Sequence, residues 1–156
     1  MESPKEFKLA PIRNGTVIDH ITAGQALNVL KILNVHEASI NSTISVGMHV
    51  RSAKKEGFKD IIKIEDRELD KTALDKIALI SPHATISIIR DFVVAEKRNV
   101  HIEDHVCGIA RCSNPNCITN MGEPIQTEFV VISRDPVSLR CAYCDRTLMN
   151  ISDNLL

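Results

Sequence analysis

The strongest constraint on the fold is the placement of the cysteines. All lie after residue 100, and four of the five form two close pairs, Cys112 with Cys117 and Cys141 with Cys144. Two such pairs, brought together by folding, are typical of structural zinc sites with tetrahedral thiolate ligands. Residues 114–116 (Asn-Pro-Asn) favour the tight bend that the first pair requires. We therefore predict a four-cysteine zinc site, although iron accepts the same ligands.

The ligand set also predicts the role of the site. Four thiolates fill the coordination sphere of zinc, so the ion is expected to be structural rather than catalytic. The remaining Cys107 is expected to be a small buried residue. His101 and His105 are alternative ligands, but their neighbours Glu103 and Asp104 indicate a solvated linker.

Composition narrows the class of protein. The 156 residues include 19 Lys and Arg against 20 Asp and Glu, four Phe, one Tyr and no Trp. Neither a basic surface nor the aromatic residues that stack on bases are prominent, so nucleic acid is not expected to be a partner. The chain has no apolar run as long as a membrane span, and its first residues are too polar for a signal peptide. We expect a cytoplasmic protein that does not bind membranes.

Hydrophobic periodicity before residue 100 predicts strands and helices in the order β-α-β-β-α-β. Strands are expected at 16–21, 44–50 and 59–65, followed by a β-rich stretch at 85–97 that bends near residue 90. Thr22 is the expected N-cap of the first helix, with Ala26, Leu27, Leu30 and Leu33 on its apolar face, and Asp70 that of the second. This order is typical of an α+β, ferredoxin-like sheet with both helices on one face, a fold that also permits pairing with a second copy.

The fold prediction comprises two domains. Residues 1–100 form the ferredoxin-like domain, and residues 101–156 form a small all-β zinc domain with strands near 127–133 and 137–140. A segment this short cannot hold a core without its metal.

Several polar residues interrupt the apolar strands. Asp19 and His20 lie within the first strand, Lys59 and Lys63 share one face of the third, and Lys97 ends the last. The first and third strands are neighbours in such a sheet, so these groups could converge on an anionic ligand that carries a sugar. Solvent exposure is the alternative interpretation. The chain has neither a phosphate-binding glycine loop nor an arrangement of nucleophile and base.

Ordered motifs along nearly the whole chain resemble the regulatory chain family of aspartate carbamoyltransferase. Residues 15–21 (GTVIDHI) match the family's R-G-T-V-I-D-H-I, with Asn14 in place of Arg. Residues 59–65 (KDIIKIE) match K-D-L-I-K-I-E, and residues 81–85 (SPHAT) resemble A-P-x-A-T. The cysteine pattern, with residues 114–118 (NPNCI) and 123–124 (EP), resembles the family's zinc domain.

The resemblance implies a non-catalytic subunit. In that family the N-terminal domain binds nucleotides and dimerises with its copy, and the zinc domain contacts the catalytic chain. Regulatory dimers link catalytic trimers, and ATP and CTP compete for one site. CTP gives feedback on pyrimidine synthesis, whereas ATP activates.

The resemblance also implies an effector site. Backbone groups around Ala10, Pro11 and Ile12 would read the base, near Val17, Ile89 and Phe92. Asp19 and Lys63 would hold the ribose, with His20, Lys59 and Lys97 near the phosphates. The complete implied set is Ala10, Pro11, Ile12, Val17, Asp19, His20, Lys59, Ile61, Lys63, Ser87, Ile89, Phe92, Val94 and Lys97.

Some positions depart from the family pattern. Familiar members have Asn where Ser87 stands and Tyr where Phe92 stands. Lys5 and Lys8 only loosely match a basic residue near a second nucleotide, which bears on any response to UTP.

Two other classes of protein remain as alternatives. A stand-alone zinc-ribbon protein that binds nucleic acid would need a basic surface. A small enzyme on a ferredoxin-like sheet would need catalytic groups that the motifs do not supply.

Overall fold

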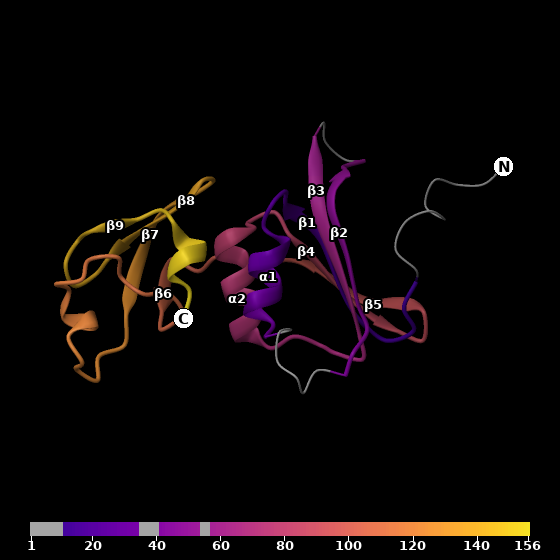
Figure 1. Ribbon diagram of the computed structural model, residues 1–156, viewed down its shortest axis with the longest axis horizontal. Helices are drawn as coiled ribbons and strands as arrows, with labels where there is room; N and C mark the ends of the chain where they lie inside the picture. The colour runs from indigo at the N-terminus through magenta and orange to yellow at the C-terminus, as the bar shows by residue number, and fades with distance from the viewer. Residues whose placement is uncertain (1–10, 35–40, 54–56) are drawn as a thin grey trace.

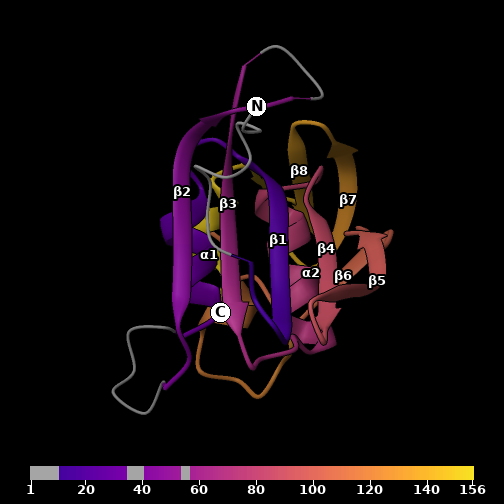
Figure 2. The ribbon, with the colours of Figure 1, turned by 90° about the vertical axis from the view of Figure 1, so that its right-hand side faces the viewer.

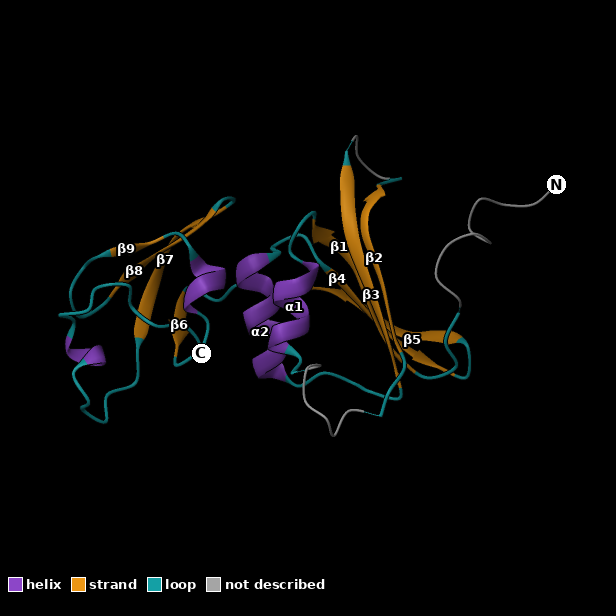
Figure 3. Ribbon diagram, in the orientation of Figure 1, coloured by secondary structure: helices purple, strands orange, loops and turns teal. Residues whose placement is uncertain are grey.

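Two antiparallel sheets with a helical layer between them make up the molecule (Figure 1). The computed structural model describes residues 11–34, 41–53 and 57–156. Both α-helices, α1 (Ala26–Ile32) and α2 (Lys71–Ile80), cover the face of the larger sheet that is turned toward the smaller one, as the colours of Figure 3 make clear. The α+β class and the placement of both helices on one face are confirmed. Among the described residues, no helix is long and apolar enough to cross a membrane.

The larger sheet has five strands in the order β2-β3-β1-β4-β5 (Figure 2). They are β1 (Gly15–Thr22), β2 (Ile44–Arg51), β3 (Phe58–Glu65), β4 (Thr85–Arg90) and β5 (Val93–Asn99). Strand β1 is central and pairs antiparallel with both β3 and β4. The first and third strands are therefore neighbours, as the β-α-β-β-α-β order predicts.

Alternation along the strands separates a buried face from an open one. Ile18 of β1 and Ile62 and Ile64 of β3 are fully buried on the helical side, against Val29 of α1 and Ile77 of α2. The intervening positions of β3 are only half-buried. Because the period of a strand is two, the residues next to the core positions form the opposite, open face of the sheet.

Helix α2 begins where the sequence predicts. The Asp70 carboxylate accepts a hydrogen bond from the Ala73 N–H at 2.8 Å, and such a cap typically stabilises a helix by about 1 kcal/mol. The N–H of Ser81 bonds to the Ile77 carbonyl at the other end. The helix therefore ends just before Pro82.

Helix α1 departs from the prediction in its cap and its apolar face. Thr22 belongs to β1, and Gln25 is the N-cap residue; its side chain caps no backbone N–H but accepts from the Asn28 amide at 2.9 Å. Instead, the Ala26 N–H donates to the Asp60 carboxylate of β3. Leu27, expected on the apolar face, is 60% exposed because the helix packs through Ala26 and Val29.

The β-rich stretch predicted at 85–97 with a bend near residue 90 is present, but it forms a hairpin of two strands where the predicted order counts one. Asp91 and Phe92 have φ values of 52° and 67°, and two successive left-handed residues are typical of a two-residue hairpin turn. β4 therefore pairs antiparallel with β5, which adds a fifth strand at the sheet edge. Every residue of β5 is exposed.

Strand β2 forms as predicted but contains a bulge. The pairing with β3 shifts between Gly47 and Val50, where one extra residue lies in β2. Met48 is consequently 49% exposed, whereas strict alternation places it on the half-buried face with Val46. The connection between β2 and β3 lies partly outside the described residues.

The smaller sheet has the strand order β6-β7-β8-β9. Its strands are β6 (His105–Cys107), β7 (Glu128–Arg134), β8 (Val137–Cys141) and β9 (Thr147–Leu148). Phe129, Leu139 and Leu148 are fully buried in its core. Two short 3-10 helices, η2 (Ile118–Asn120) and η3 (Ile151–Asn154), complete this part of the chain.

The two parts meet through α2 and η3. Leu79 and Ile80 of α2 and Ile151 of η3 are buried, and the Lys76 ammonium donates to the Leu156 carbonyl. His83 Nε2 lies 2.9 Å from the Asp135 carboxylate across the same boundary, within hydrogen-bonding distance. Apolar packing, flanked by polar contacts, therefore joins the larger sheet's helical layer to the smaller sheet.

The segment before β6 is less solvated than its polar residues predict. Ile102 is 7% exposed and Val106 is 5% exposed, and both belong to the buried core. The segment therefore packs against the molecule rather than extending through solvent.

Candidate metal centre and charged sheet face

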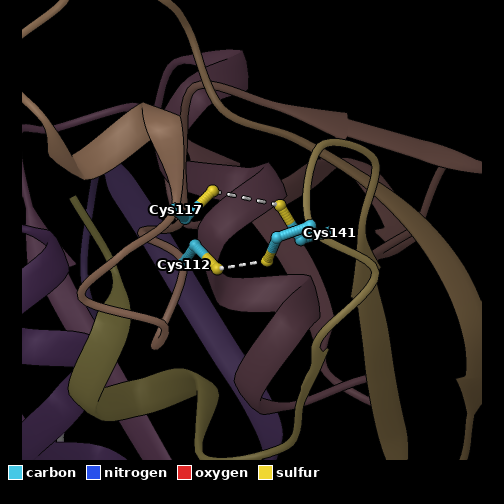
Figure 4. A group of neighbouring side chains, drawn as sticks. Cys112, Cys117 and Cys141 are labelled. Atoms are coloured by element: carbon cyan, nitrogen blue, oxygen red, sulfur yellow. Dashed lines mark hydrogen bonds between the residues drawn. The ribbon is translucent and has the colours of Figure 1, made fainter.

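The four predicted ligands lie together in the smaller domain. The Sγ atoms of Cys112, Cys117, Cys141 and Cys144 all lie within 4.8 Å of one another. Cys112 is 3.6 Å from Cys144, and Cys117 is 3.7 Å from Cys141 (Figure 4). Sulfur atoms at the corners of a tetrahedron around zinc, each bonded at about 2.3 Å, are about 3.8 Å apart. The spacing of the thiols therefore fits a tetrahedral metal ion.

Two tight turns present these sulfurs. In the first, the Asn114 N–H donates to the Cys112 sulfur at 3.5 Å, and the Thr119 hydroxyl donates to the Cys117 sulfur at 3.2 Å. The Asn120 amide closes this turn by donating to the carbonyls of Cys112 and Asn114. Donors to sulfur favour the thiolate form, so the loop supplies an outer shell as well as ligands.

The second turn continues from β8. Cys141 ends the strand, and its N–H donates to the Arg146 carbonyl at 2.9 Å. Asp145 has a φ of 63°, the left-handed conformation that reverses the chain before β9. The first cysteine pair is therefore positioned mainly by hydrogen bonds within its own turn, and the second by the pairing of β8 with β9.

The electrostatics of the cluster favour a bound cation. Burial raises the pKa of the Cys112 thiol to about 12, with the neighbouring sulfurs adding to the rise. Burial also acts to raise the pKa of Cys144, but hydrogen bonds from the Arg146 N–H and the Asn114 side chain lower it to about 7. Four thiolates this close repel one another, and a divalent ion compensates that repulsion.

The alternative ligands His101 and His105 are not part of this cluster, and Cys107 is not buried as expected. His101 and His105 are exposed and are not among the clustered groups of the described residues. Cys107, expected to be buried, is exposed on β6, and its sulfur is 3.8 Å from the Glu128 carboxylate. Its side chain points outward because Val106 occupies the inward position of this short strand.

The open face of the larger sheet gathers most of the other predicted site residues. Cross-strand pairing places Lys63, Val17, Ser87 and Lys97 in one row across β3, β1, β4 and β5. Ser45 of β2 extends the row beyond Lys63. The row has a cation at each side and small or apolar residues between them, a surface that can hold a flat molecule and its negative charge.

A charged cluster lies beside this row, one step along β1 and β3. The Lys59 ammonium is 2.8 Å from the Asp19 carboxylate, which also accepts the His20 N–H at 2.6 Å. His20 Nδ1 is 3.3 Å from the Thr85 hydroxyl, and Thr85 pairs with Asp19 across the strands. The predicted convergence of Asp19, His20 and Lys59 is therefore present.

The charged cluster is electrostatically tuned. Burial acts to raise the pKa of Asp19, but the hydrogen bonds from Lys59 and His20 and the nearby positive charge outweigh burial and lower it. Burial lowers the pKa of Lys63, while the Asp19 carboxylate partly opposes this shift. Lys63 is thus a partly desolvated cation, and a bound anion would restore its lost solvation.

On the opposite side of the row from this cluster, the open face is apolar. Ile89 is 8% exposed and pairs with Gly15 and with Val94 of β5. Phe92 is 66% exposed at the hairpin turn, where its N–H donates to the Arg13 carbonyl and so brings the segment after Pro11 and Ile12 nearby. Gly15 at the apolar side and Asp19 in the charged cluster are about 13 Å apart along β1, at the rise of an extended strand.

The remaining predicted positions have mixed locations. Ile61 is half-buried on the open face and pairs with Gly47 of β2. Pro11 is exposed and Ile12 is buried. Ala10, Lys5 and Lys8 lie outside the described residues.

Sequence reasoning missed three residues around this face. Thr85 contacts His20, and Ser45 lies beside Lys63. Asp60 is fully buried on the opposite side of β3. A signal for Asp60 was present, because residues 60, 62 and 64 share one face and the other two are isoleucine.

Comparisons with known proteins cover almost the whole chain. Residues 7–101 match the family model described as the allosteric domain of the aspartate carbamoyltransferase regulatory chain. Residues 104–152 match the model described as the metal binding domain of the same chain.

Curated relatives agree with both models. The regulatory chain of Methanothrix thermoacetophila is 54% identical over 92% of this chain and 92% of its own length. Those of Methanothermobacter thermautotrophicus and Methanocella arvoryzae are 51% and 50% identical, over 95% and 100% of this chain and 93% and 100% of their own. The chain belongs to the aspartate carbamoyltransferase regulatory chain family, as a non-catalytic subunit with an allosteric domain and a metal-binding domain.

Proposed function

We propose that this chain binds ATP and CTP on the open face of its larger sheet and transmits their presence to the catalytic chain of aspartate carbamoyltransferase. The main observation behind this proposal is the row of Lys63, Val17, Ser87 and Lys97, with the cluster of Asp19, His20 and Lys59 beside it along β1 and β3. The apolar side suits a base, and the charged side suits a ribose and phosphates. The family's allosteric domain supports this assignment.

Each group has a proposed role. Backbone groups around residues 10–12 read the base, which packs near Ile89 and Phe92. Asp19 accepts from the ribose hydroxyls and Lys63 donates to them. Lys59, His20 and Lys97 contact the phosphates. Since one face receives both nucleotides, ATP and CTP compete, and each shifts the enzyme only by its different affinity for two quaternary states.

The metal-binding domain is proposed to carry one structural Zn²⁺ on its four cysteines and to contact the catalytic chain. Four buried or half-buried thiols with tetrahedral spacing leave no position for substrate. The boundary between the domains is placed at residues 100 and 101. Two copies are proposed to pair through residues 1–100 and to link catalytic trimers in the cytoplasm, where CTP gives feedback on pyrimidine synthesis.

The nucleic-acid alternative has less support. In the metal-binding half, Arg134 pairs with Asp104 at 2.6 Å and Arg140 with Asp145 at 3.9 Å. These arginines are therefore partly neutralised rather than gathered as a basic stripe.

Reconstitution tests the proposal directly. The chain, loaded with zinc or stripped of it, is mixed with a catalytic trimer of aspartate carbamoyltransferase, and mass is measured by light scattering. We expect a larger assembly only with zinc, and we expect the carbamoyltransferase rate of that assembly to respond to ATP and CTP. UTP is tested as well, because Lys5 and Lys8 loosely match a basic residue near a second nucleotide. Assembly without metal, or a rate that ignores both nucleotides, would contradict the proposal. Salt-sensitive binding to DNA or RNA would favour the alternative.

A further inference from the structure

We propose that Asp60 is a positioning residue, which holds the charged cluster of the open face in place from the opposite side of the sheet. This inference rests on the proposed nucleotide site and adds a residue that would not touch the nucleotide. Asp60 lies between Lys59 and Ile61 on β3, and its side chain is fully buried on the helical side. A carboxylate is rarely buried in this way unless strong hydrogen bonds compensate for its lost hydration.

The compensation comes from three backbone groups. One carboxylate oxygen accepts from the N–H groups of Gly24 and Ala26, both at 3.0 Å. The other accepts from the His49 N–H at 2.8 Å. Gly24 lies in the β1–α1 connection, Ala26 begins α1, and His49 lies in β2, so Asp60 joins segments on both sides of its own strand. Such bonds to a charged group are stronger than neutral ones.

Both strands that flank β3 bulge near Asp60. On β1, Asp19 and His20 lie between Ile18, which pairs with Ile62, and Ile21, which pairs with Asp60. A bulge places one extra residue in a strand and redirects its side chains. It lets the adjacent Asp19 and His20 both approach the open face, where strict alternation would turn one of them toward the core.

The second bulge lies across β3. On β2, Met48 and His49 lie between the partners of Ile61 and Lys59, and Asp60 is the single residue opposite them. His49 has a φ of 57°, and His20 on β1 has a φ of 56°. A non-glycine residue in this conformation needs a surrounding structure that holds it there. The bond from His49 to Asp60 supplies such a restraint directly.

The proposed mechanism follows from these contacts. Asp60 fixes the chain after β1 and the bulge of β2, and β3 carries Lys59 as its neighbour. The relative positions of Asp19, His20 and Lys59 therefore depend on the buried carboxylate. Because coupling is reciprocal, a nucleotide that holds this cluster also stabilises the bonds to Asp60.

The variant test uses the full-length, zinc-loaded chain with Asp60→Asn, which keeps the shape but removes one acceptor oxygen. Thr16→Val is the matched control: Thr16 is also fully buried on the helical side of β1, and its hydroxyl donates to the Arg67 carbonyl at 2.6 Å, away from the bulges. Calorimetry measures CTP and CMP binding. We expect Asp60→Asn to weaken CTP about tenfold and to reduce the ratio of CTP to CMP affinity. Thr16→Val should keep that ratio even where it lowers thermal stability.

Three results would overturn the inference. They are unchanged CTP binding by Asp60→Asn, equal losses of CTP and CMP, and an equal fall in the ratio for Thr16→Val. Failure of the wild-type chain to bind CTP would instead overturn the proposed function, and this inference with it.

A measurement on the wild-type chain covers the case in which Asp60→Asn does not fold. Hydrogen exchange is followed at the amides of Gly24, Ala26 and His49 with and without saturating CTP. Reciprocity requires CTP to slow their exchange although the amides lie away from the open face. Unchanged exchange with CTP bound would contradict the positioning role.

Discussion

At the scale of single residues, the pair formed by Lys59 and Asp19 is expected to affect both stability and binding. The pKa of Asp19 lies below its ordinary value of 3.8, since hydrogen bonds and positive charge favour the carboxylate over the effect of burial. Folding therefore favours the ionised form. The resulting stabilisation is present above the unfolded pKa and is lost as the pH falls through the lower folded pKa.

Asp19→Asn should consequently flatten the acid side of the stability curve. We expect the wild-type advantage in free energy of unfolding to shrink as the pH falls below about 4. Urea denaturation at several pH values measures this, with Asp153→Asn on η3 as a control. A difference in free energy of unfolding between the wild type and Asp19→Asn that stays constant or grows as the pH falls would contradict the ion-pair role.

Binding by the same residue has its own test. Asp19→Ala should weaken CTP and ATP more than inorganic triphosphate, because the proposed partner of Asp19 is the ribose. Calorimetric titrations with the three probes measure the difference. Equal losses for all three would remove the ribose role.

Lys97 lies at the exposed end of the row and belongs to the proposed phosphate contacts. Lys97→Ala should weaken ATP and CTP by a similar factor, about tenfold, since removing a hydrogen bond from a charged donor to either triphosphate costs about 1.5 kcal/mol. Competition binding assays measure both affinities. Arg98→Ala, one position along β5, is the matched control, and a weaker affinity for one nucleotide alone would argue against a shared site.

Single residues also show how far sequence patterns reach. The cysteine ligands were predictable because each pair is local, and Lys59 and Lys63 because period two places them on one face. The exposure of Cys107 was not predictable, since it depends on which residue of a three-residue strand faces the core. The bonds of Asp60 were not predictable either, since their donors lie 11 to 36 residues away along the chain and no local pattern contains them.

At the scale of elements, the two cysteine turns are expected to depend on the metal. Cys141→Ser or chelation should unfold the smaller sheet, because metal binding supplies folding free energy to a segment with a small core. Assembly with the catalytic chain should be abolished while CTP binding is largely kept. Circular dichroism, metal content and calorimetry measure these effects, with Cys107→Ser as a control that should change none of them.

The hairpin of β4 and β5 shows why elements are harder to predict than residues. The β-rich pattern of 85–97 was recognised, but the turn contains Asp91 and Phe92 rather than glycine. Its left-handed backbone is instead held by bonds from the Asp91 N–H to the Asn14 side chain and from the Phe92 N–H to the Arg13 carbonyl. The hairpin turn places Lys97 beside Ser87. This part of the open face could not be predicted from sequence alone, because the turn is held by contacts with residues 13 and 14.

At the scale of the whole molecule, the contact between α2 and η3 is expected to make the two sheets unfold together. Ile151 is 4% exposed at this contact, beside a groove of about 380 Å³. Ile151→Ala should cost about 2–5 kcal/mol and separate the thermal transition into two, because a cavity replaces the packing that joins the parts. Scanning calorimetry on the zinc-loaded chain measures this.

Met149 provides the control for that experiment. It lines the same groove but is 64% exposed, so Met149→Ala should leave a single transition with little change in midpoint. Equal effects of the two substitutions would show that the groove surface, rather than the buried contact, joins the parts.

The helical layer between the sheets also has an evolutionary consequence. The open face of the larger sheet and the smaller sheet lie on opposite sides of the layer formed by α1 and α2 (Figure 1). Substitutions on these two surfaces can therefore accumulate independently of one another. The buried residues of α2 are more constrained, because a change in their volume alters the packing against both sheets. Among relatives, we expect substitutions to be least frequent at these positions.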